Sequence, residues 1–337
     1  MKTEGRQREL WLDGLKGFGI LLVILGHVLS GYMDAWTFPE AYWSFYGIRT
    51  WIYSFHMPMF FLISGYAFSL AYYRNGRLRK DGFFRQLGNL FLVYTIFVLL
   101  QWGIKQAVPE LVNETYTLDD LKGMFIEPLG NFWYIYVLFI IYIIAAVTGL
   151  PRRSPWWLLI PAAAAVYVAD IHLDWTNLTL YRIVFHLLFF GVGCVLHRYK
   201  NVLRSPKLMG YCWMILAVMT YLHVFWYIRN WFSYWRVLLA LCTGVVNLCM
   251  FCRWEKLARF PLFRICGKYC LELYLLHTFF TGGLRTVLTL WGLTDPWGSV
   301  WVNFAISTAV SLLIAWLCDK WRWGSLLFRP LRLLKRK

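Results

Sequence analysis

Two ionisable residues near the N-terminus lie inside an apolar stretch, residues 11–31, that is long enough to cross a membrane. Lys16 and His27 are eleven residues apart, about three helical turns, so both side chains lie on one face, roughly 16 Å apart along the axis. Asp13 falls near that face and can pair with Lys16. Because ionisable groups inside a membrane span are costly and mostly functional, this spacing predicts a polar stripe that ends at a histidine. The structural alternative is a snorkelling lysine and a hydrogen-bonded core histidine.

A second histidine lies just before a proline in residues 48–73. This span runs in the opposite direction, so His56 is predicted at a depth similar to that of His27. Pro58 removes one helical hydrogen bond and exposes a carbonyl one turn earlier. The pattern predicts either a broken helix that forms a polar pocket in lipid or a simple kink.

A third group of polar residues lies in residues 269–292. Cys270, Tyr274 and His277 share one helix face at the spacing i, i+4, i+7. Tyr274 and His277 could bind a substrate or bond to neighbouring helices. Glu272 lies on another face and can pair with Lys268, four residues earlier.

The remaining histidines and the cysteines predict no metal site. His186 and His223 are solitary in apolar segments and are predicted to be structural. Cys249 and Cys252 have ligand spacing but no second pair, so small core residues are the better interpretation. None of the eight cysteines lies in a predicted outer loop, so no extracellular disulfide framework is expected.

The composition identifies the class of protein that must position these groups. Of the 337 residues, 60% are hydrophobic and only 15% are charged, with a mean hydropathy of +0.52, whereas soluble domains are about a quarter charged. We therefore predict an all-α polytopic membrane protein, a bundle of about ten transmembrane helices that forms a single integral-membrane domain over residues 1–337. The expected spans are 11–31, 48–73, 86–106, 131–150, 155–170, 177–197, 208–228, 234–252, 269–292 and 297–319.

The positive charge follows the positive-inside rule. With the N-terminus in the cytoplasm, 26 of the 34 basic residues fall in inner segments and seven lie near outer ends. This asymmetry predicts an even number of spans with both termini cytoplasmic. It also accounts for most of the net charge of +17, so the expected partner is the lipid bilayer and not nucleic acid.

The polar motifs together resemble the acyltransferase-3 family of membrane-bound O-acyltransferases. They are Leu-Asp-Gly-Leu-Lys16 followed by His27, then Phe-His56-Met-Pro-Met-Phe-Phe, then Gly-Lys268 through Tyr-Leu-Leu-His277. The second motif is most similar to the fucose-acetylase-like branch, which acetylates surface polysaccharides. The resemblance implies ten-span enzymes of the bacterial plasma membrane and an essential basic residue and histidine at Lys16 and His27.

The resemblance also implies an acyl-CoA donor, with acetyl-CoA expected, and a glycan or lipid-linked sugar as acceptor. Many family members have arginine where this chain has Lys16, and a family pair of arginines is matched only by Arg85, with Gly88 at the second position. Basic residues of the loop before the third span, including Arg77, remain candidates for binding the donor. The expected catalytic residues are His27, Lys16 and His56, the expected donor ligands are Lys16, Arg85 and Arg77, the expected acceptor ligands are Tyr274 and His277, and no metal is expected.

Two other functions fit the same residues. Intramembrane histidines can relay protons in a transporter or flippase, in which a broken helix binds the solute. A non-catalytic subunit of a polysaccharide export system is the third possibility. The absence of an inverted repeat in the sequence argues mildly against a transporter.

Overall fold

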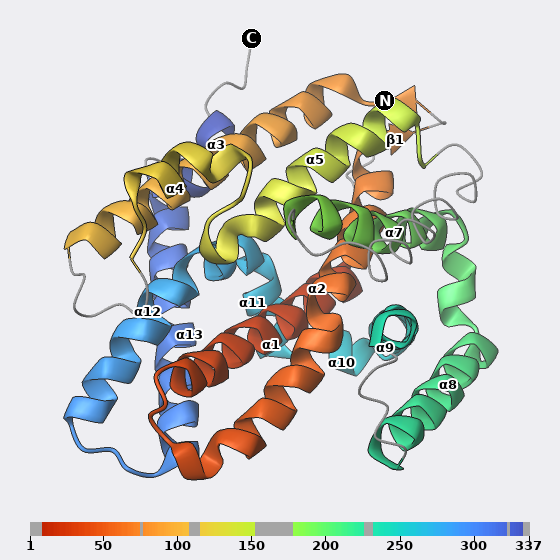
Figure 1. The fold of residues 1–337 in the computed structure, drawn as a ribbon. Coiled ribbons are helices and arrows are strands. Elements are labelled where there is room, and N and C mark those ends of the chain that lie inside the picture. The colour runs from red at the N-terminus through yellow and green to blue at the C-terminus, as the bar shows by residue number, and fades with distance from the viewer. Residues whose placement is uncertain are drawn as a thin grey trace.

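The fold is almost entirely helical in the computed structural model of the chain (Figure 1). One short antiparallel hairpin, β1 (Tyr73–Arg74) and β2 (Arg77–Leu78), connects the second long helix to the third. The structure describes residues 9–74, 77–107, 115–151, 178–225, 232–321 and 324–332.

Nine long helices coincide with nine of the ten expected spans, and the fifth expected span, 155–170, lies outside the described residues. Six described helical segments are long and apolar enough to cross a membrane, and shorter apolar helices accompany them, which confirms an all-α polytopic membrane protein. The long helices are α1 (Leu10–Asp34), α2 (Tyr42–Tyr72), α3 (Lys80–Ala107), α5 (Trp133–Thr148), α7 (Leu178–Arg198), α8 (Pro206–Phe225), α9 (Phe232–Arg253), α12 (Cys270–Leu290) and α13 (Pro296–Lys320).

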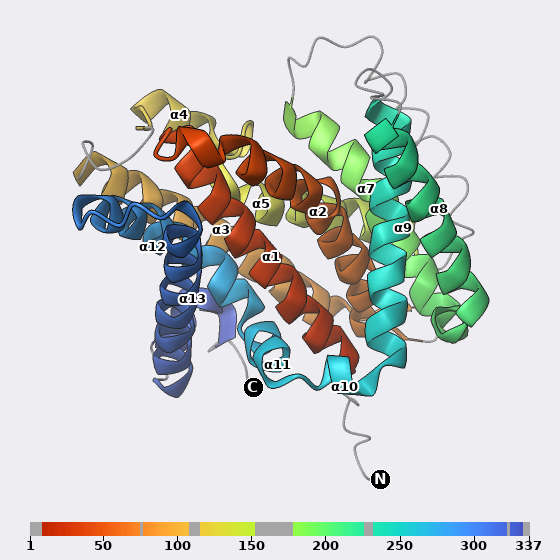
Figure 2. The same cartoon turned by 90° about the horizontal axis from the view of Figure 1, so that it is seen from below.

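Short helices lie at both ends of the bundle (Figure 2). Helix α4 (Leu118–Lys122) lies at one end, and α10 (Glu255–Ala258) and α11 (Pro261–Lys268) lie at the other. The start of α1 lies at the same end of the bundle as α10 and α11. The last described segment lies there too and contains α14 (Gly324–Phe328) and a 3-10 turn at Pro330–Arg332. Further 3-10 turns elsewhere in the chain are Pro39–Ala41, Gly123–Phe125, Gly130–Phe132 and Lys200–Arg204.

Helix α1 is central because glycines let its neighbours approach closely. A Cβ atom on Gly17 would lie 1.8 Å from the carbonyl oxygen of Phe263 in α11, and one on Gly267 would lie 1.8 Å from that of Asp13. The main chains of α1 and α11 therefore touch, as small residues allow in membrane bundles.

Helices α2 and α7 approach in the same way. A Cβ on Gly65 of α2 would lie 1.9 Å from the carbonyl oxygen of Phe190, and one on Gly193 of α7 would lie 2.1 Å from that of Leu62. This packing brings His56 of α2 and His186 of α7 into the same part of the bundle.

The expectation of a broken helix at Pro58 is wrong. Helix α2 is a single α-helix from Tyr42 to Tyr72 with Pro58 inside it. Because the main-chain amides around Pro58 remain in a continuous helix, they are engaged in helical hydrogen bonds and are not free to bind a ligand.

The expected pairing of Glu272 with Lys268 is also replaced by other partners. The buried carboxylate of Glu272 lies 3.3 Å from the guanidinium of Arg329, and Lys268 lies 3.1 Å from Asp319 of α13. Arg329 belongs to a C-terminal segment that docks on α3, where the main-chain nitrogen of Leu331 donates to Asn89 at 2.9 Å. Long-range partners of this kind cannot be read from i, i+4 spacing.

Candidate active site

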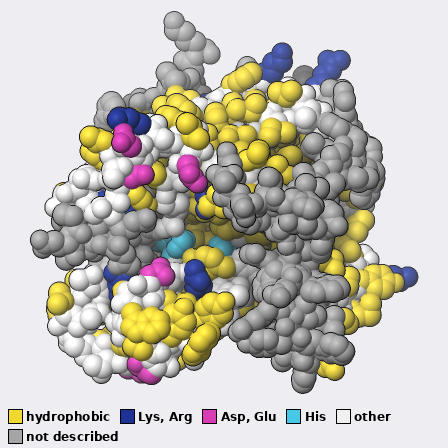
Figure 3. Space-filling model, in the orientation of Figure 1, with side chains coloured by type: hydrophobic (Ala, Val, Ile, Leu, Met, Phe, Trp, Pro, Cys, Tyr) yellow, Lys and Arg dark blue, Asp and Glu magenta, His cyan; other side chains and the backbone are white. Residues whose placement is uncertain are grey.

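The described residues line a cavity of about 420 Å³ where five helices meet, α1, α2, α5, α7 and α12. This size lies in the usual range of small-molecule sites, roughly 300–1,000 Å³. The face of the molecule seen in Figure 1 is hollowed near its centre, and histidine side chains are visible inside the hollow (Figure 3). The lining residues come from the C-terminal half of α1, the first half and middle of α2, the turn before α5, the starts of α5 and α7, and one residue of α12: Val23, His27, Ser30, Asp34, Arg49, Tyr53, Ser54, His56, Met57, Pro58, Asn131, Trp133, Leu178, Tyr181, Arg182, Phe185, His186 and Tyr274.

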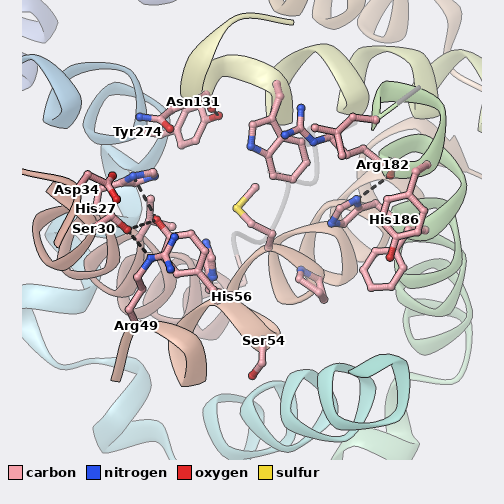
Figure 4. Close-up of a pocket in the computed structure, with 18 residues that line it drawn as sticks. His27, Ser30, Asp34, Arg49, Ser54, His56, Asn131, Arg182, His186 and Tyr274 are labelled. Carbon is pink, nitrogen blue, oxygen red and sulfur yellow. Dashed lines mark hydrogen bonds between the residues drawn. The ribbon is translucent and has the colours of Figure 1, made fainter. Parts of the chain in front are cut away.

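His27 is part of a chain of polar contacts that links α1 to α2 (Figure 4). Its Nδ1 lies 3.3 Å from the hydroxyl of Tyr53, which lies 3.2 Å from the hydroxyl of Ser30. Arg49 donates from Nε to the same Ser30 hydroxyl at 2.7 Å, and its guanidinium covers the ring of Tyr53 at 4.9 Å. The network fixes the orientation of the His27 ring beside a permanent positive charge.

Three other histidines in this region share one hydrogen-bond pattern. Nδ1 of His56, His186 and His277 lies 2.8, 2.7 and 2.9 Å, respectively, from the main-chain carbonyl four residues earlier on its own helix. A carbonyl only accepts, so in the neutral ring Nδ1 carries the proton and Nε2 is an acceptor. His27 differs from these three, because its Nδ1 faces a hydroxyl that can donate or accept.

His277 lies behind His27 and is not among the residues that line the cavity. The two ring centroids are 5.2 Å apart. His277 is fully buried, and its Nε2 has no hydrogen-bond partner in the structure. Nε2 of His277 is therefore a buried acceptor whose ring packs against that of His27.

The structure brings together some of the residues that the sequence singled out and separates others. His27, His56 and Tyr274 line the cavity, and Tyr274 donates to the main-chain oxygen of Asn131. Lys16, Arg77 and Arg85 do not line it. Lys16 lies three helical turns away on α1, where its carbonyl oxygen is 3.8 Å from Sγ of Cys270.

Several polar residues of the cavity have no role in the sequence interpretation. Arg49 and Arg182 are two of the seven basic residues that the positive-inside count assigned to outer helix ends, and the count gave them no other role. His186 was interpreted as a solitary structural histidine. His186 packs against Phe61 and Trp133 at 4.3 and 5.2 Å between ring centroids and lines the cavity. The spacing places Arg49 on the helix face of His56, seven residues later, and Arg182 on that of His186, four residues later. The contact of Arg182 with Trp133 of α5 joins residues distant in sequence and gives no such signal.

Comparison with known proteins identifies the family. The family model described as an acyltransferase domain, that of acyltransferase-3, matches residues 9–320. The chain belongs to the acyltransferase-3 family. It is therefore a multi-pass membrane protein of an acyltransferase family, and the resemblance found in its motifs is confirmed. No solved structure matches this chain.

Relatives of this chain include two nodulation proteins and an inner membrane protein. It is 35% identical to the nodulation protein NolL of Mesorhizobium japonicum over 184 residues. This match covers 54% of this chain and 47% of the relative. It is 24% identical to NolL of Sinorhizobium fredii over 63% of this chain and 56% of the relative. It is also 24% identical to the inner membrane protein YcfT of Escherichia coli over 81% of this chain and 79% of the relative. The matches to the two nodulation proteins thus span about half of their length.

Proposed function

We propose that this acyltransferase moves an acetyl group from cytoplasmic acetyl-CoA to a hydroxyl of a cell-surface glycan or its lipid-linked precursor. The single observation that carries the proposal is the cavity in which His27 meets Tyr53, Ser30 and Arg49 within a chain of this family. An apolar bundle that holds a titratable ring, a permanent cation and hydroxyl groups in one cavity is suited to acyl transfer between oxygen and sulfur.

In the proposed reaction, His27 accepts the proton of the acceptor hydroxyl as its oxygen attacks the thioester carbon. Histidine suits this step because its proton affinity matches neutral pH. The contact between Nδ1 and the Tyr53 hydroxyl orients the imidazole, and the ring of His277 packs against its other side. Collapse of the intermediate expels the CoA thiolate, which takes the proton.

The developing oxyanion needs a donor, and the side chains are better candidates than the main chain. The amides around Pro58 belong to a continuous helix. Nε2 of His56 is an acceptor in the neutral ring, because Nδ1 is bonded to Ile52. Arg49 is permanently charged and connected to His27 through Ser30 and Tyr53, so we propose that its guanidinium supplies this stabilisation.

The donor reaches His27 from the opposite end of α1. Lys16, with Arg77 and Arg85 near the inner ends of neighbouring elements, supplies positive charge for the CoA phosphates. The distance between Lys16 and His27, about 16 Å along the helix, suits an extended pantetheine arm. Tyr274 contacts the acceptor from α12, and no metal takes part.

We further propose that the chain resides in the bacterial inner membrane, as the relative YcfT does by name. The test of the whole proposal is transfer by the purified protein. Acetyl-CoA labelled in its acetyl group is incubated with protein and with membranes that carry surface glycan from the source cell. We expect label in the glycan that mild alkali releases, since alkali cleaves O-esters but not amides. No label above a reaction with heat-inactivated protein contradicts the proposal.

A further inference from the structure

We infer that Arg182 binds an anionic oxygen group of the acceptor, a carboxylate or phosphate attached to a sugar, while the hydroxyl to be acylated lies at His27. This inference rests on the proposed function, because it names the class of acceptor for the same cavity. It starts from the way in which charge is distributed around the cavity.

The two sides of the cavity carry different charges. Figure 4 shows Asp34, Ser30, His27 and Arg49 together on one side and Arg182 with His186 on the other. On the first side the charges of Asp34 and Arg49 offset one another. Among the described lining residues, Arg182 is the only permanently charged side chain of the second side. That side therefore attracts an anion.

The guanidinium of Arg182 is held but not neutralised. Its central carbon lies over the ring of Trp133, 4.8 Å from the ring centroid, in a cation–π contact that leaves N–H groups of the guanidinium for other partners. Within the described part of the chain, no carboxylate forms an ion pair with Arg182. Glu127, whose charge acts on it, is exposed at the surface. A guanidinium held in this way keeps N–H groups for a planar, bidentate anion.

The position of Arg182 is fixed by its helix. Its main-chain oxygen accepts from Nδ1 of His186, whose ring lies against Trp133. Nε2 of His186 is then an acceptor at the cavity wall, suited to a sugar hydroxyl next to the anionic group. Tyr181 and Phe185 supply flat apolar surface on the same helix. An acid-bearing sugar matches this combination better than a neutral one, because a neutral sugar would leave a half-buried guanidinium without a counter-charge.

Binding measurements without acyl-CoA test the proposed anion site independently of acyl transfer. The probes are trigalacturonic acid and its full methyl ester, which differ in charge, and galactose 1-phosphate and galactose, which test phosphate in place of carboxylate. Affinity for the detergent-solubilised protein is measured by calorimetry at low salt. We expect at least one anionic probe to bind about tenfold more tightly than its neutral partner, which corresponds to about 1.4 kcal/mol.

The matched variants are Arg182→Gln, Arg182→Lys and Arg198→Gln, the last an exposed arginine at the far end of the same helix. We expect Arg182→Gln to remove the preference for the anion, Arg182→Lys to keep part of it, and Arg198→Gln to leave it unchanged. The melting temperature of each variant without ligand checks that it is folded.

Three outcomes would overturn the inference: no anionic probe binds more tightly than its neutral partner, the preference survives in Arg182→Gln, or Arg49→Gln alone removes it. If the anion preference follows Arg182 but labelled acetyl-CoA yields no ester, the proposed function fails and the anion site stands. If transfer occurs to neutral glycan only, the reverse holds.

Discussion

At the scale of the residue, the site depends on how histidine tautomers are fixed. The carbonyls of Ile52, Arg182 and Leu273 each hold Nδ1 of the histidine four positions later. His27 instead faces Tyr53, whose hydroxyl can change its direction of donation. Nδ1 of His27 can therefore either carry a proton or accept one, whereas a carbonyl fixes the neutral rings of the other three histidines in the Nδ1–H form. This difference singles out His27 among the four.

We expect His27→Ala to lower acyl transfer by about 10²- to 10⁴-fold, the usual contribution of a general base, while the protein stays inserted and folded. The ring is only partly buried, so its loss leaves no large cavity. The matched control is His197→Ala, at the other end of the bundle against Tyr66, which should keep most of the activity. Turnover near wild type in a well-folded His27→Ala variant would rule out this mechanism.

Lys16 should act on the donor and not on the acceptor. We expect Lys16→Ala to raise the KM for acetyl-CoA, with less effect on kcat, and Lys16→Arg to keep much of the activity, because either side chain presents positive charge to a phosphate. Steady-state kinetics with varied acetyl-CoA measure both constants. If the double variant Asp13→Asn with Lys16→Gln recovers the wild-type KM, Lys16 only neutralises Asp13 and has no role in donor binding.

At the scale of the element, the sequence predicted the helices well and their partners poorly. Hydropathy located nine helices because a span of about 20 apolar residues has few other interpretations. The sequence also placed His27, His56 and Tyr274 among the candidates, because a polar residue in such a span is conspicuous. Arg182 and His186 could not be assigned, since their role depends on contact with α2 and α5. The pairing of Glu272 with Arg329 joins residues 57 positions apart, beyond the reach of any local pattern.

The contact between α1 and α11 should tolerate no side chain at Gly17. We expect Gly17→Ala to lower the stability of the folded protein by about 1–3 kcal/mol, the usual cost of overpacking, because the added Cβ would meet the main-chain oxygen of Phe263. Gly103→Ala in α3 is the control, since nothing lies within 4 Å of its added Cβ. That change should be neutral or stabilising. Thermal unfolding in detergent measures both, and equal melting temperatures would contradict the close packing.

The C-terminal segment should be held by the Glu272–Arg329 pair. We expect Arg329→Gln to destabilise the protein because it leaves the buried carboxylate of Glu272 without its partner, although by less than the 3–5 kcal/mol of a fully buried pair, since Arg329 is half-exposed. Adding Glu272→Gln should restore much of the loss. A double-mutant cycle in thermal unfolding measures the coupling, and additive effects would show that the pair does not hold the segment.

At the scale of the whole molecule, the cavity and the described ends of the chain lie toward opposite ends of the helix bundle. The cavity is built from the end of α1 and the starts of α2, α5 and α7, which lie toward the α4 end of the bundle, while both ends of the described chain lie at the other (Figure 2). The described basic residues of 253–268, which the sequence count predicts to be cytoplasmic, lie at that other end with α10 and α11. A donor entering there and an acceptor entering at the cavity would meet at His27 without either crossing the membrane.

Cysteine labelling on intact cells tests this orientation. Thr117→Cys, exposed at the start of α4, should react with a membrane-impermeant maleimide, whereas Lys207→Cys, exposed at the start of α8, should react only after permeabilisation. Position 207 lies at the α10 end of the bundle, since the neighbouring carbonyl of Arg204 accepts from Arg253, at the end of α9. The wild-type protein is the control, since its described cysteines are buried or partly buried. The reverse pattern would place the cavity on the cytoplasmic side, and an acceptor at the cell surface could then not reach His27 through it.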